Sequence, residues 1–559
     1  MRNHTYDPTN HYNDFTWKIP ECYNIGVDIC DKWATKQPKR TAIIDVSTDS
    51  QCREYSFSDL MLGASQLAHA LTSLGIQPAQ CQGAVGDRVG ILLPQCAQTA
   101  ISHIAVLRMG CVSLPLFTLF GEQALLHRLR DSEAKAVITN SEGAQKIGKI
   151  RSQLPKLEHI ISIDAFTGDA LDFTTICDRQ AEFFKPALTK PDDPALLIYT
   201  SGTTGDPKGA LHAHRVLPGH LPGVEISHNF LPATGDRFWT PADWAWIGGL
   251  LDVLMPALHH GIPVVAYRFT KFDAKAAFDL MKKHQINNVF LPPTAIKLMK
   301  QWPDARQQGI RLRSVGSGGE TLGSELLAWG QEAFATTINE FYGQTECNMV
   351  ISACAALEPP VPGSMGRAVP GHEVQIVDPR TGVVQEPNVE GTIAIKAPDP
   401  VMFLGYWNNH KASEAKFVDG PDGRWLLTGD RGKRDTSGHF FFIGRDDDVI
   451  NSAGYRIGPA EIENCLIGHE AVSLAGVVGQ PDELRGEIVT AFLTLKAGFV
   501  PGESLANDIA SFVKSRLAAH EYPRAIHFID SMPMTTTGKI IRARLREWVL
   551  ESSVNAPIR

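Results

Sequence analysis

Short apolar runs alternate with longer amphipathic segments through the first half of the chain. Residues 41–45 and 53–55 have the composition of strands, and the capping-box sequence at 56–59 predicts that a helix begins directly after them. Leucines recur at helical spacing through that segment, and Gly75 is placed to end it. The chain therefore opens with strands followed by a helix that has one apolar face.

The same order of elements returns immediately afterwards. Residues 87–93 are expected to form a strand, a helix should run from Pro94 to about Met109, and residues 111–115 should form the next strand. Further strands with similar flanks are predicted at 136–139, 196–199, 263–267, 288–291 and 314–315. Because strands that alternate with helices are typical of βαβ crossovers, we expect an α/β body with a largely parallel sheet.

The pattern changes after about residue 372, where strands and turns replace helix-length segments, as at 373–377, 391–395 and 439–443. Beyond them the chain reads as a small α+β unit, with strands at 448–451, 475–478, 488–495 and 525–529 and helices at 460–466 and 505–518. The predicted fold class is α/β: a large N-terminal domain of α/β subdomains plus a β-rich subdomain, then a small α+β C-terminal domain. We expect their boundary in the charged turn at 444–448.

Composition excludes several classes of protein. The 559 residues are 43% hydrophobic and 20% charged, which favours a globular protein over a disordered one. With 53 Lys and Arg against 61 Asp and Glu, and no long basic tract, nucleic acid is not an expected partner. No signal-peptide pattern and no apolar run long enough to cross a membrane occurs, so we expect a soluble cytoplasmic protein. The ten cysteines lack the spacing of a disulfide framework or a zinc site.

The most informative segment is Tyr199-Thr-Ser-Gly-Thr-Thr-Gly-Asp-Pro-Lys-Gly209, which follows an apolar strand. Its glycines, hydroxyl groups and single lysine are suited to wrap a polyphosphate, although a solvated turn has the same composition. It is not a Walker A loop, because Lys208 lies between Pro207 and a glycine rather than before Ser or Thr.

Six further segments occur in a characteristic order, at 316–321, 340–346, 363–367, 425–430, 444–456 and 533–539. Together with the loop at 199–209, they make the chain from about 24 to 545 resemble the adenylate-forming (AMP-binding, ANL) superfamily, in particular acetyl-CoA and medium-chain acyl-CoA synthetases. The resemblance implies a large domain for ATP and the acid at 1–445, a hinge at 446–448 and a small mobile domain at 449–559.

That resemblance implies an acid-thiol ligase that uses ATP, Mg²⁺ and coenzyme A. An acyl-AMP forms with release of pyrophosphate, and the thiol of coenzyme A then takes the acyl group. The implied catalytic residues are Lys539, which bridges carboxylate and nucleotide, Glu346, which binds the metal, and Thr345 and Thr200, which hold phosphates.

The same resemblance assigns the rest of the site. Asp430 and Arg445 would contact the ribose, Tyr342 the adenine, Arg456 the pyrophosphate, and Asp447 would be the hinge residue. Ala453 and Gly454 would leave room for coenzyme A. The implied nucleotide-binding set is Thr200, Ser201, Gly202, Thr203, Thr204, Gly205, Lys208, Gly319, Glu320, Thr321, Glu340, Phe341, Tyr342, Gly343, Gln344, Thr345, Asp430, Arg445, Arg456 and Lys539.

The implied acyl pocket consists of Trp244, Trp246, Ile247, Gly248 and Gly343. Enzymes restricted to acetate carry Trp where this chain has Gly343, so the two glycines should leave volume for a larger acid. Each tryptophan could be a pocket wall or part of the core. We expect short-to-medium-chain carboxylic acids as substrates, with aryl or alicyclic carboxylates as the alternative.

Other functions keep weaker support. A carrier-linked peptide-synthetase role lacks a Gly-Gly-x-Ser motif, and serine hydrolysis lacks a Gly-x-Ser-x-Gly elbow. A luciferase-like oxygenase shares the motifs. A metal site at His212, His214, His259 and His260 lacks further ligands at suitable spacing. A catalytically inactive nucleotide-binding or acyl-adenylate-binding protein should have lost Lys539, Glu346, Asp430 or Arg445, and all four are present.

Overall fold

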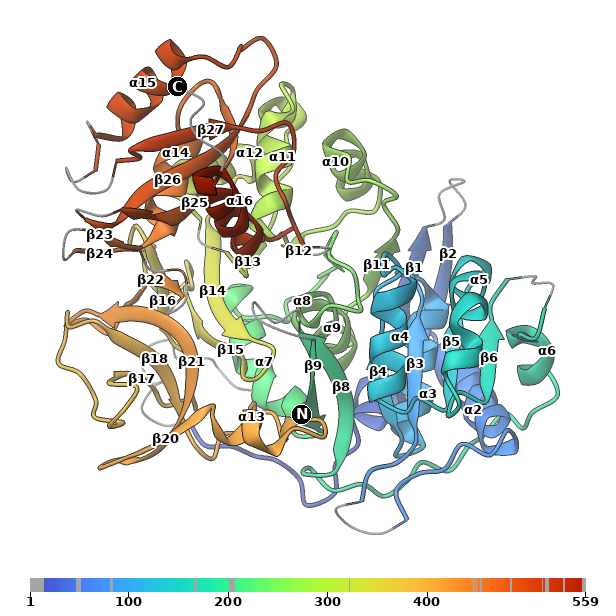
Figure 1. Ribbon diagram of the computed structural model, residues 1–559. Helices are drawn as coiled ribbons and strands as arrows, with labels where there is room; N and C mark the ends of the chain where they lie inside the picture. Colours follow the sequence, from blue (N-terminus) through green and yellow to red (C-terminus); the bar gives the residue numbers. More distant parts are fainter. Residues whose placement is uncertain are drawn as a thin grey trace.

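The computed structural model describes residues 15–46, 52–80, 84–164, 168–200, 207–320, 322–445, 448, 450–452, 455–482, 485–514, 516–517, 522–535 and 538–554. Helices pack against three β-sheets in this part of the chain (Figure 1). The helices are α1 (Lys32–Lys36), α2 (Phe57–Ser73), α3 (Ala97–Arg108), α4 (Glu122–Asp131), α5 (Ser141–Ile150), α6 (Phe173–Cys177), α7 (Val216–Ser227), α8 (Ile247–Gly249), α9 (Met255–His260), α10 (Ala274–Lys283), α11 (Pro293–Gln301), α12 (Ser324–Phe334), α13 (His410–Glu414), α14 (Pro459–Ile467), α15 (Glu503–Lys514) and α16 (Arg542–Val554).

The first sheet has eight strands in the order β19-β9-β8-β4-β3-β5-β6-β7. Its strands are β3 (Arg88–Leu92), β4 (Val112–Pro115), β5 (Ala136–Thr139), β6 (His159–Ser162), β7 (Leu171–Asp172), β8 (Pro194–Thr200), β9 (Lys208–Ala213) and β19 (Gly405–Tyr406). From β8 to β7 every pairing is parallel, as expected, whereas β9 runs antiparallel to β8. The glycine-rich loop therefore joins two paired strands at one edge of the sheet.

The second sheet has fourteen strands. They are β1 (Thr41–Val46), β2 (Cys52–Ser56), β10 (Phe238–Trp239), β11 (Val264–Tyr267), β12 (Asn288–Phe290), β13 (Ser314–Gly318), β14 (Ile338–Gln344), β15 (Asn348–Ser352), β16 (Ser364–Ala368), β17 (Val374–Val377), β18 (Gly391–Lys396), β20 (Phe417–Gly420), β21 (Gly423–Arg434) and β22 (Phe440–Arg445). The strands β11, β10, β12, β13 and β14 pair in parallel, and the pairings from β14 to β17 are antiparallel. The β-rich part thus continues the parallel sheet by hydrogen bonding.

Two predictions that depend only on neighbouring residues are confirmed, the capping box at Ser56 and the helix stop at Gly75. At the start of α2, Asp59 N donates to the Ser56 hydroxyl and Ser56 N donates to the Asp59 carboxylate, which is the expected capping box. Gly75 follows that helix with φ +85°. The expected start of the next helix at Pro94 is wrong: α3 begins at Ala97, because the residues before it stay extended and Cys96 is the N-cap.

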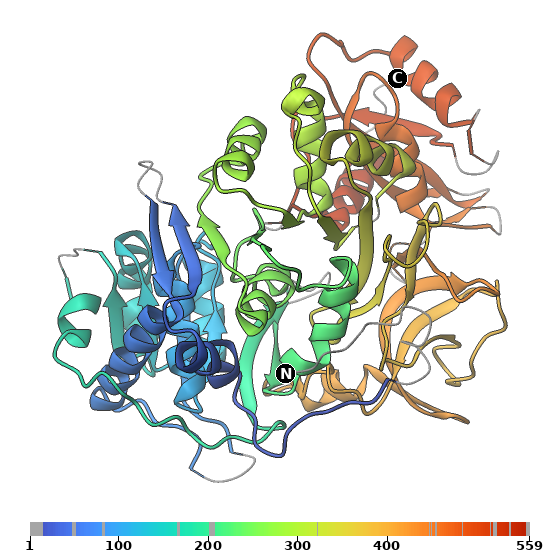
Figure 2. The same ribbon diagram turned by 180° about the vertical axis from the view of Figure 1, so that it is seen from behind.

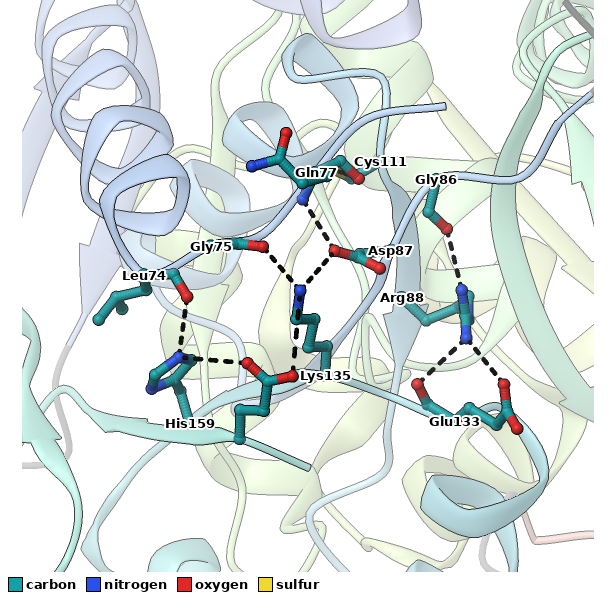
Figure 3. Close-up of polar contacts among 11 residues, drawn as sticks. Leu74, Gly75, Gln77, Gly86, Asp87, Arg88, Cys111, Glu133, Lys135 and His159 are labelled. Atoms are coloured by element: carbon teal, nitrogen blue, oxygen red, sulfur yellow. Dashed lines mark hydrogen bonds and ion pairs between the residues drawn. The ribbon is translucent and has the colours of Figure 1, made fainter. Parts of the chain in front are cut away.

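Lys135 and Arg88 connect the ends of two helices to the end of the first sheet at which its parallel strands begin (Figure 3). Lys135 Nζ donates to Gly75 O at 2.7 Å, after the end of α2, and lies 3.3 Å from Asp87. Arg88 Nε donates to Ser132 O at 2.7 Å, after the end of α4. Positive charge at a helix C-terminus is favourable. These contacts therefore stabilise the end of the sheet at which the parallel strands begin, away from their carboxyl ends.

The C-terminal residues form a separate sheet of five strands: β23 (Ile450–Ser452), β24 (Tyr455–Ile457), β25 (Val472–Asp482), β26 (Gly486–Leu495) and β27 (Ala525–Phe528). This confirms the small α+β domain, although α16 was not predicted. Both ribbon views place this part beside α11 and α12 (Figures 1 and 2). The boundary stays a prediction, since 446 and 447 lie outside the described residues. No described helix combines the length and apolarity needed to cross a bilayer.

Candidate active site

The candidate site lies where the parallel strands β13 and β14 reach their carboxyl ends, which is where α/β sheets bind ligands. Gly319 (φ +96°) and Glu320 follow β13, while Thr345 and Glu346 follow β14. In the first sheet, the last residue of β8, Thr200, pairs with Lys208 across the glycine-rich loop. Much of the predicted nucleotide set therefore comes from strand ends and the turns that follow them.

Asp430 is a buried carboxylate opposite Arg445 on the paired strands β21 and β22. Tyr342 Oη and Gln344 Nε2 each donate to Asp430 Oδ2 at 2.6 Å. Arg445 Nε lies 3.8 Å from the other oxygen, Oδ1. Burial raises the pKa of this carboxyl, while Arg445, Tyr342 and Gln344 oppose that shift. These two hydrogen bonds reach Oδ2, so Oδ1 keeps acceptor capacity for a ligand hydroxyl.

Lys539 lies on a tight C-terminal hairpin. Gly538 (φ +84°) donates its N–H to Thr535 O at 2.9 Å, and Thr535 N–H donates to Lys539 O at 2.7 Å. The hairpin contacts the large domain, because Thr294 Oγ1 of α11 donates to Gly538 O at 3.1 Å. Lys539 is therefore carried to the site by the small domain.

The side chain of Lys539 lies next to Gly319. A Cβ placed on Gly319 would lie 3.6 Å from Lys539 Cε and from the ring of Trp246. Loss of solvation lowers the pKa of Lys539, although the residue as a whole is exposed; Glu320, Asp430 and Glu346 favour its charged form and Arg445 opposes it. The ammonium thus lies in the field of the three acidic residues that the nucleotide motifs supply.

Glu346 is buried, and its Oε1 accepts a hydrogen bond from the Tyr406 hydroxyl. Lys208 Nζ lies 5.4 Å from the centroid of the same tyrosine ring. Among the described residues, no three His, Cys, Asp or Glu side chains group so as to hold a metal ion. One buried carboxylate fits Mg²⁺ that takes its other ligands from phosphate and water.

Glu340 holds the backbone next to the candidate site in place. Its Oε1 accepts the Leu322 N–H at 2.9 Å, which ties β14 to the turn that follows β13. Burial raises the pKa of this carboxyl to about 8. The hydrogen bond from Leu322 to Glu340 therefore positions the backbone around the predicted nucleotide-binding residues.

The two glycines of the predicted acyl pocket are closely packed at their Cα atoms, and the volume expected beside them stays a prediction. A Cβ on Gly343 would lie 1.6 Å from Asn348 O, because β14 and β15 approach closely at an irregularity in their register. A Cβ on Gly248 would lie 2.8 Å from the Trp246 ring and 2.9 Å from Phe290. Neighbouring atoms therefore occupy the position of a Cβ at both glycines.

The two tryptophans differ in placement. Trp244 is fully buried within the largest apolar cluster, so it belongs to the core. Trp246 is partly buried and points toward Gly319, and its ring lies 5.7 Å from that of Phe290, which lies 5.5 Å from Phe341. Ile247 is also partly buried against the core.

Sequence reasoning missed several residues near the site, because none belongs to a recognised motif. They are Phe290, Thr294, Tyr406 and Lys416, the last of which donates to Thr428 O at 3.2 Å beside Asp430. Some predicted residues lie outside the described part of the chain: Ser201, Gly202, Thr203, Thr204, Gly205, Thr321, Asp447, Ala453 and Gly454. For Arg456, the structure describes only the backbone, in β24.

Two family descriptions match the chain, and together they cover most of both domains. Residues 30–407 match the family described as "AMP-binding enzyme", and residues 461–539 match "AMP-binding enzyme C-terminal domain". The chain belongs to the AMP-binding enzyme family.

Named relatives span nearly the whole chain. It is 32% identical to the acetyl-coenzyme A synthetase of Bacillus subtilis (strain 168) over 539 residues, which are 94% of this chain and 91% of the relative. It is 32% identical to the mitochondrial acyl-coenzyme A synthetase ACSM4 of Homo sapiens, with 95% and 91% covered. Its structure is similar to that of the anthranilate CoA ligase AuaEII in complex with anthranoyl-AMP, with TM-score 0.85, 29% identity, and 95% and 98% covered.

Proposed function

We propose that this chain is an ATP-dependent acid:CoA ligase. A carboxylate oxygen attacks the α-phosphorus of ATP, pyrophosphate leaves, and an acyl-AMP results. The thiolate of coenzyme A then attacks the acyl carbon, and AMP leaves. The observation that carries this proposal is the position of Lys539, whose Cε lies 3.6 Å from a Cβ placed on Gly319, in the field of Glu320, Asp430 and Glu346.

Each residue of the proposed first step has a physical role. Two anions must meet for a carboxylate to attack ATP, so an ammonium at Lys539 lowers their repulsion and stabilises charge that develops on the α-phosphate. Asp430 Oδ1 is placed to accept hydrogen bonds from ribose hydroxyls. Glu346 would hold Mg²⁺, which neutralises phosphate charge when it is bound.

The second step has a different requirement, since the thiol of coenzyme A must reach the acyl carbon. We propose that the small domain turns about Asp447, withdraws Lys539 and brings Gly454 to the path of the coenzyme A arm. The contacts with α11 argue that this structure represents the arrangement for adenylation.

Short-to-medium-chain carboxylic acids remain the proposed substrates, supported by the relatives named acetyl- and acyl-coenzyme A synthetases. That support does not rest on the two glycines, because a Cβ at either one would overlap neighbouring atoms. The partly buried ring of Trp246 favours the alternative, an aryl carboxylate, and one structural neighbour is an anthranilate CoA ligase.

A panel of acids tests the proposal. We expect pyrophosphate–ATP exchange only with the correct acid, from a set that runs from acetate to decanoate and includes benzoate and anthranilate. Lys539→Ala should abolish exchange yet still convert supplied acyl-AMP and coenzyme A to thioester. Exchange by no acid would refute the ligase, and equal loss of both half-reactions would refute the role of Lys539.

A further inference from the structure

One stripe of α11 contacts the small domain or lies next to that contact. Thr294, Lys297 and Gln301 have the spacing i, i+3 and i+7, which places them on one face of the helix. Thr294 Oγ1 donates to Gly538 O at 3.1 Å, and Gln301 Nε2 donates to Ser473 Oγ at 3.3 Å. Lys297 lies between these two contacts along the helix.

Lys297 is a mostly buried ammonium that pairs with a carboxylate of the large domain. Its Nζ lies 3.4 Å from Oε2 of Glu320, next to the predicted nucleotide site, and its side chain is 12% exposed. Its charge also acts on Glu463 of α14 in the small domain: burial raises the pKa of Glu463, whereas Arg542 and Lys297 oppose that shift. Without Lys297, these two carboxylates would lose a shared positive neighbour where water is scarce.

Glu463 is in turn connected to the hairpin that carries Lys539. Arg542 Nη2 and Nε donate to the two oxygens of Glu463 at 2.6 and 3.2 Å, and Arg542 Nη1 lies 3.3 Å from Asp448. Arg542 is the first residue of α16, three positions after Lys539. A paired guanidinium at this point holds the end of the hairpin in place.

We propose that Lys297 is a positioning residue for acyl-adenylate formation. Its ammonium pairs with Glu320 between the two hydrogen bonds that α11 makes with the small domain, and so holds the Lys539 hairpin against Gly319. This inference rests on the proposed function. When the small domain turns to expose the acyl-AMP to coenzyme A, α14 leaves α11, so Lys297 has no part in the second half-reaction.

The test compares the two half-reactions in the same preparation. Lys297→Gln keeps much of the side-chain length and removes the charge, while Lys297→Arg keeps the charge. The matched control is Lys275→Gln, since Lys275 pairs with Asp279 inside α10 on the surface. First, pyrophosphate–ATP exchange is measured with the acid that supports it in the wild type; second, conversion of synthetic acyl-AMP and coenzyme A to thioester is measured.

We expect Lys297→Gln to lower the maximal exchange rate about tenfold, equivalent to about 1.4 kcal/mol, with little change in the KM for ATP. Thioester formation should stay within about twofold. Lys297→Arg should restore most of the exchange, and Lys275→Gln should leave both rates unchanged. Since both rates come from one preparation, partial unfolding of the variant lowers them together and leaves their ratio interpretable.

Three results would overturn the proposal: unchanged exchange in Lys297→Gln, an equal fall in both half-reactions, or no recovery in Lys297→Arg. These outcomes leave the ligase function intact. Wild-type protein without acid-dependent exchange, or Lys539→Ala with full exchange, would instead refute the proposed function and this inference with it.

Discussion

The buried carboxyl of Glu340 should make stability fall as pH rises toward the alkaline range. Its pKa is raised from 4.5 to about 8 by burial, so between these values the folded protein retains a proton that the unfolded chain has lost. The stabilisation is fully present below the unfolded pKa and is lost as pH rises through the folded one. The perturbation that removes this dependence is Glu340→Gln, which keeps the shape and the acceptor for Leu322 N–H.

The magnitude follows from the shift. At about 1.36 kcal/mol per pKa unit, moving from 4.5 to about 8 corresponds to on the order of 4 to 5 kcal/mol across the window. Glu340→Gln should therefore be comparable to wild type near pH 5 and more stable near pH 8.5, where the wild-type carboxyl ionises at a cost in free energy.

The assay is the thermal midpoint of wild type and variant across this pH range. The difference in midpoint should grow with pH by several degrees, as expected for a few kcal/mol in a large domain. Glu332→Gln is a suitable control, because Glu332 is an exposed side chain of α12 paired with Arg306. Parallel pH curves for wild type and Glu340→Gln would refute the reasoning.

Two further predictions address the nucleotide and the scaffold. Asp430→Asn should weaken ATP binding about tenfold, because the amide lacks the charge and one acceptor that the carboxylate offers; titration calorimetry would contradict the ribose contact if affinity were unchanged. Lys135→Met should lower the free energy of unfolding by about 1 kcal/mol, since it removes the contacts with Gly75 O and Asp87. Exchange kinetics should stay unchanged in Lys135→Met, and a kinetic defect with normal stability would contradict a purely structural role.

Elements set by neighbouring residues and the parallel pairing of the βαβ units could be predicted, but the joining of the β-rich part to the parallel sheet could not. The capping box at Ser56 and the stop at Gly75 depend on contacts within a few residues, and both are present. The continuity of the β-rich part with the parallel sheet depends on hydrogen bonds between strands far apart in the sequence, such as Ser364 with Phe441. The helix α16 carries no clear local signal, and it was missed.

For the site, the sequence alone determined the family and named Lys539, Asp430, Tyr342 and Glu346, because these residues lie in ordered motifs. Only the tertiary structure decided which of them meet and what surrounds them. It placed the Tyr342 hydroxyl 2.6 Å from Asp430, and it placed Lys297 3.4 Å from Glu320 on the face of α11 that contacts the small domain. It also showed that the carbonyl oxygen of Asn348 lies where a Cβ on Gly343 would be. The physical reason is that motifs record residue types, whereas charge and volume depend on neighbours that folding brings from elsewhere in the chain.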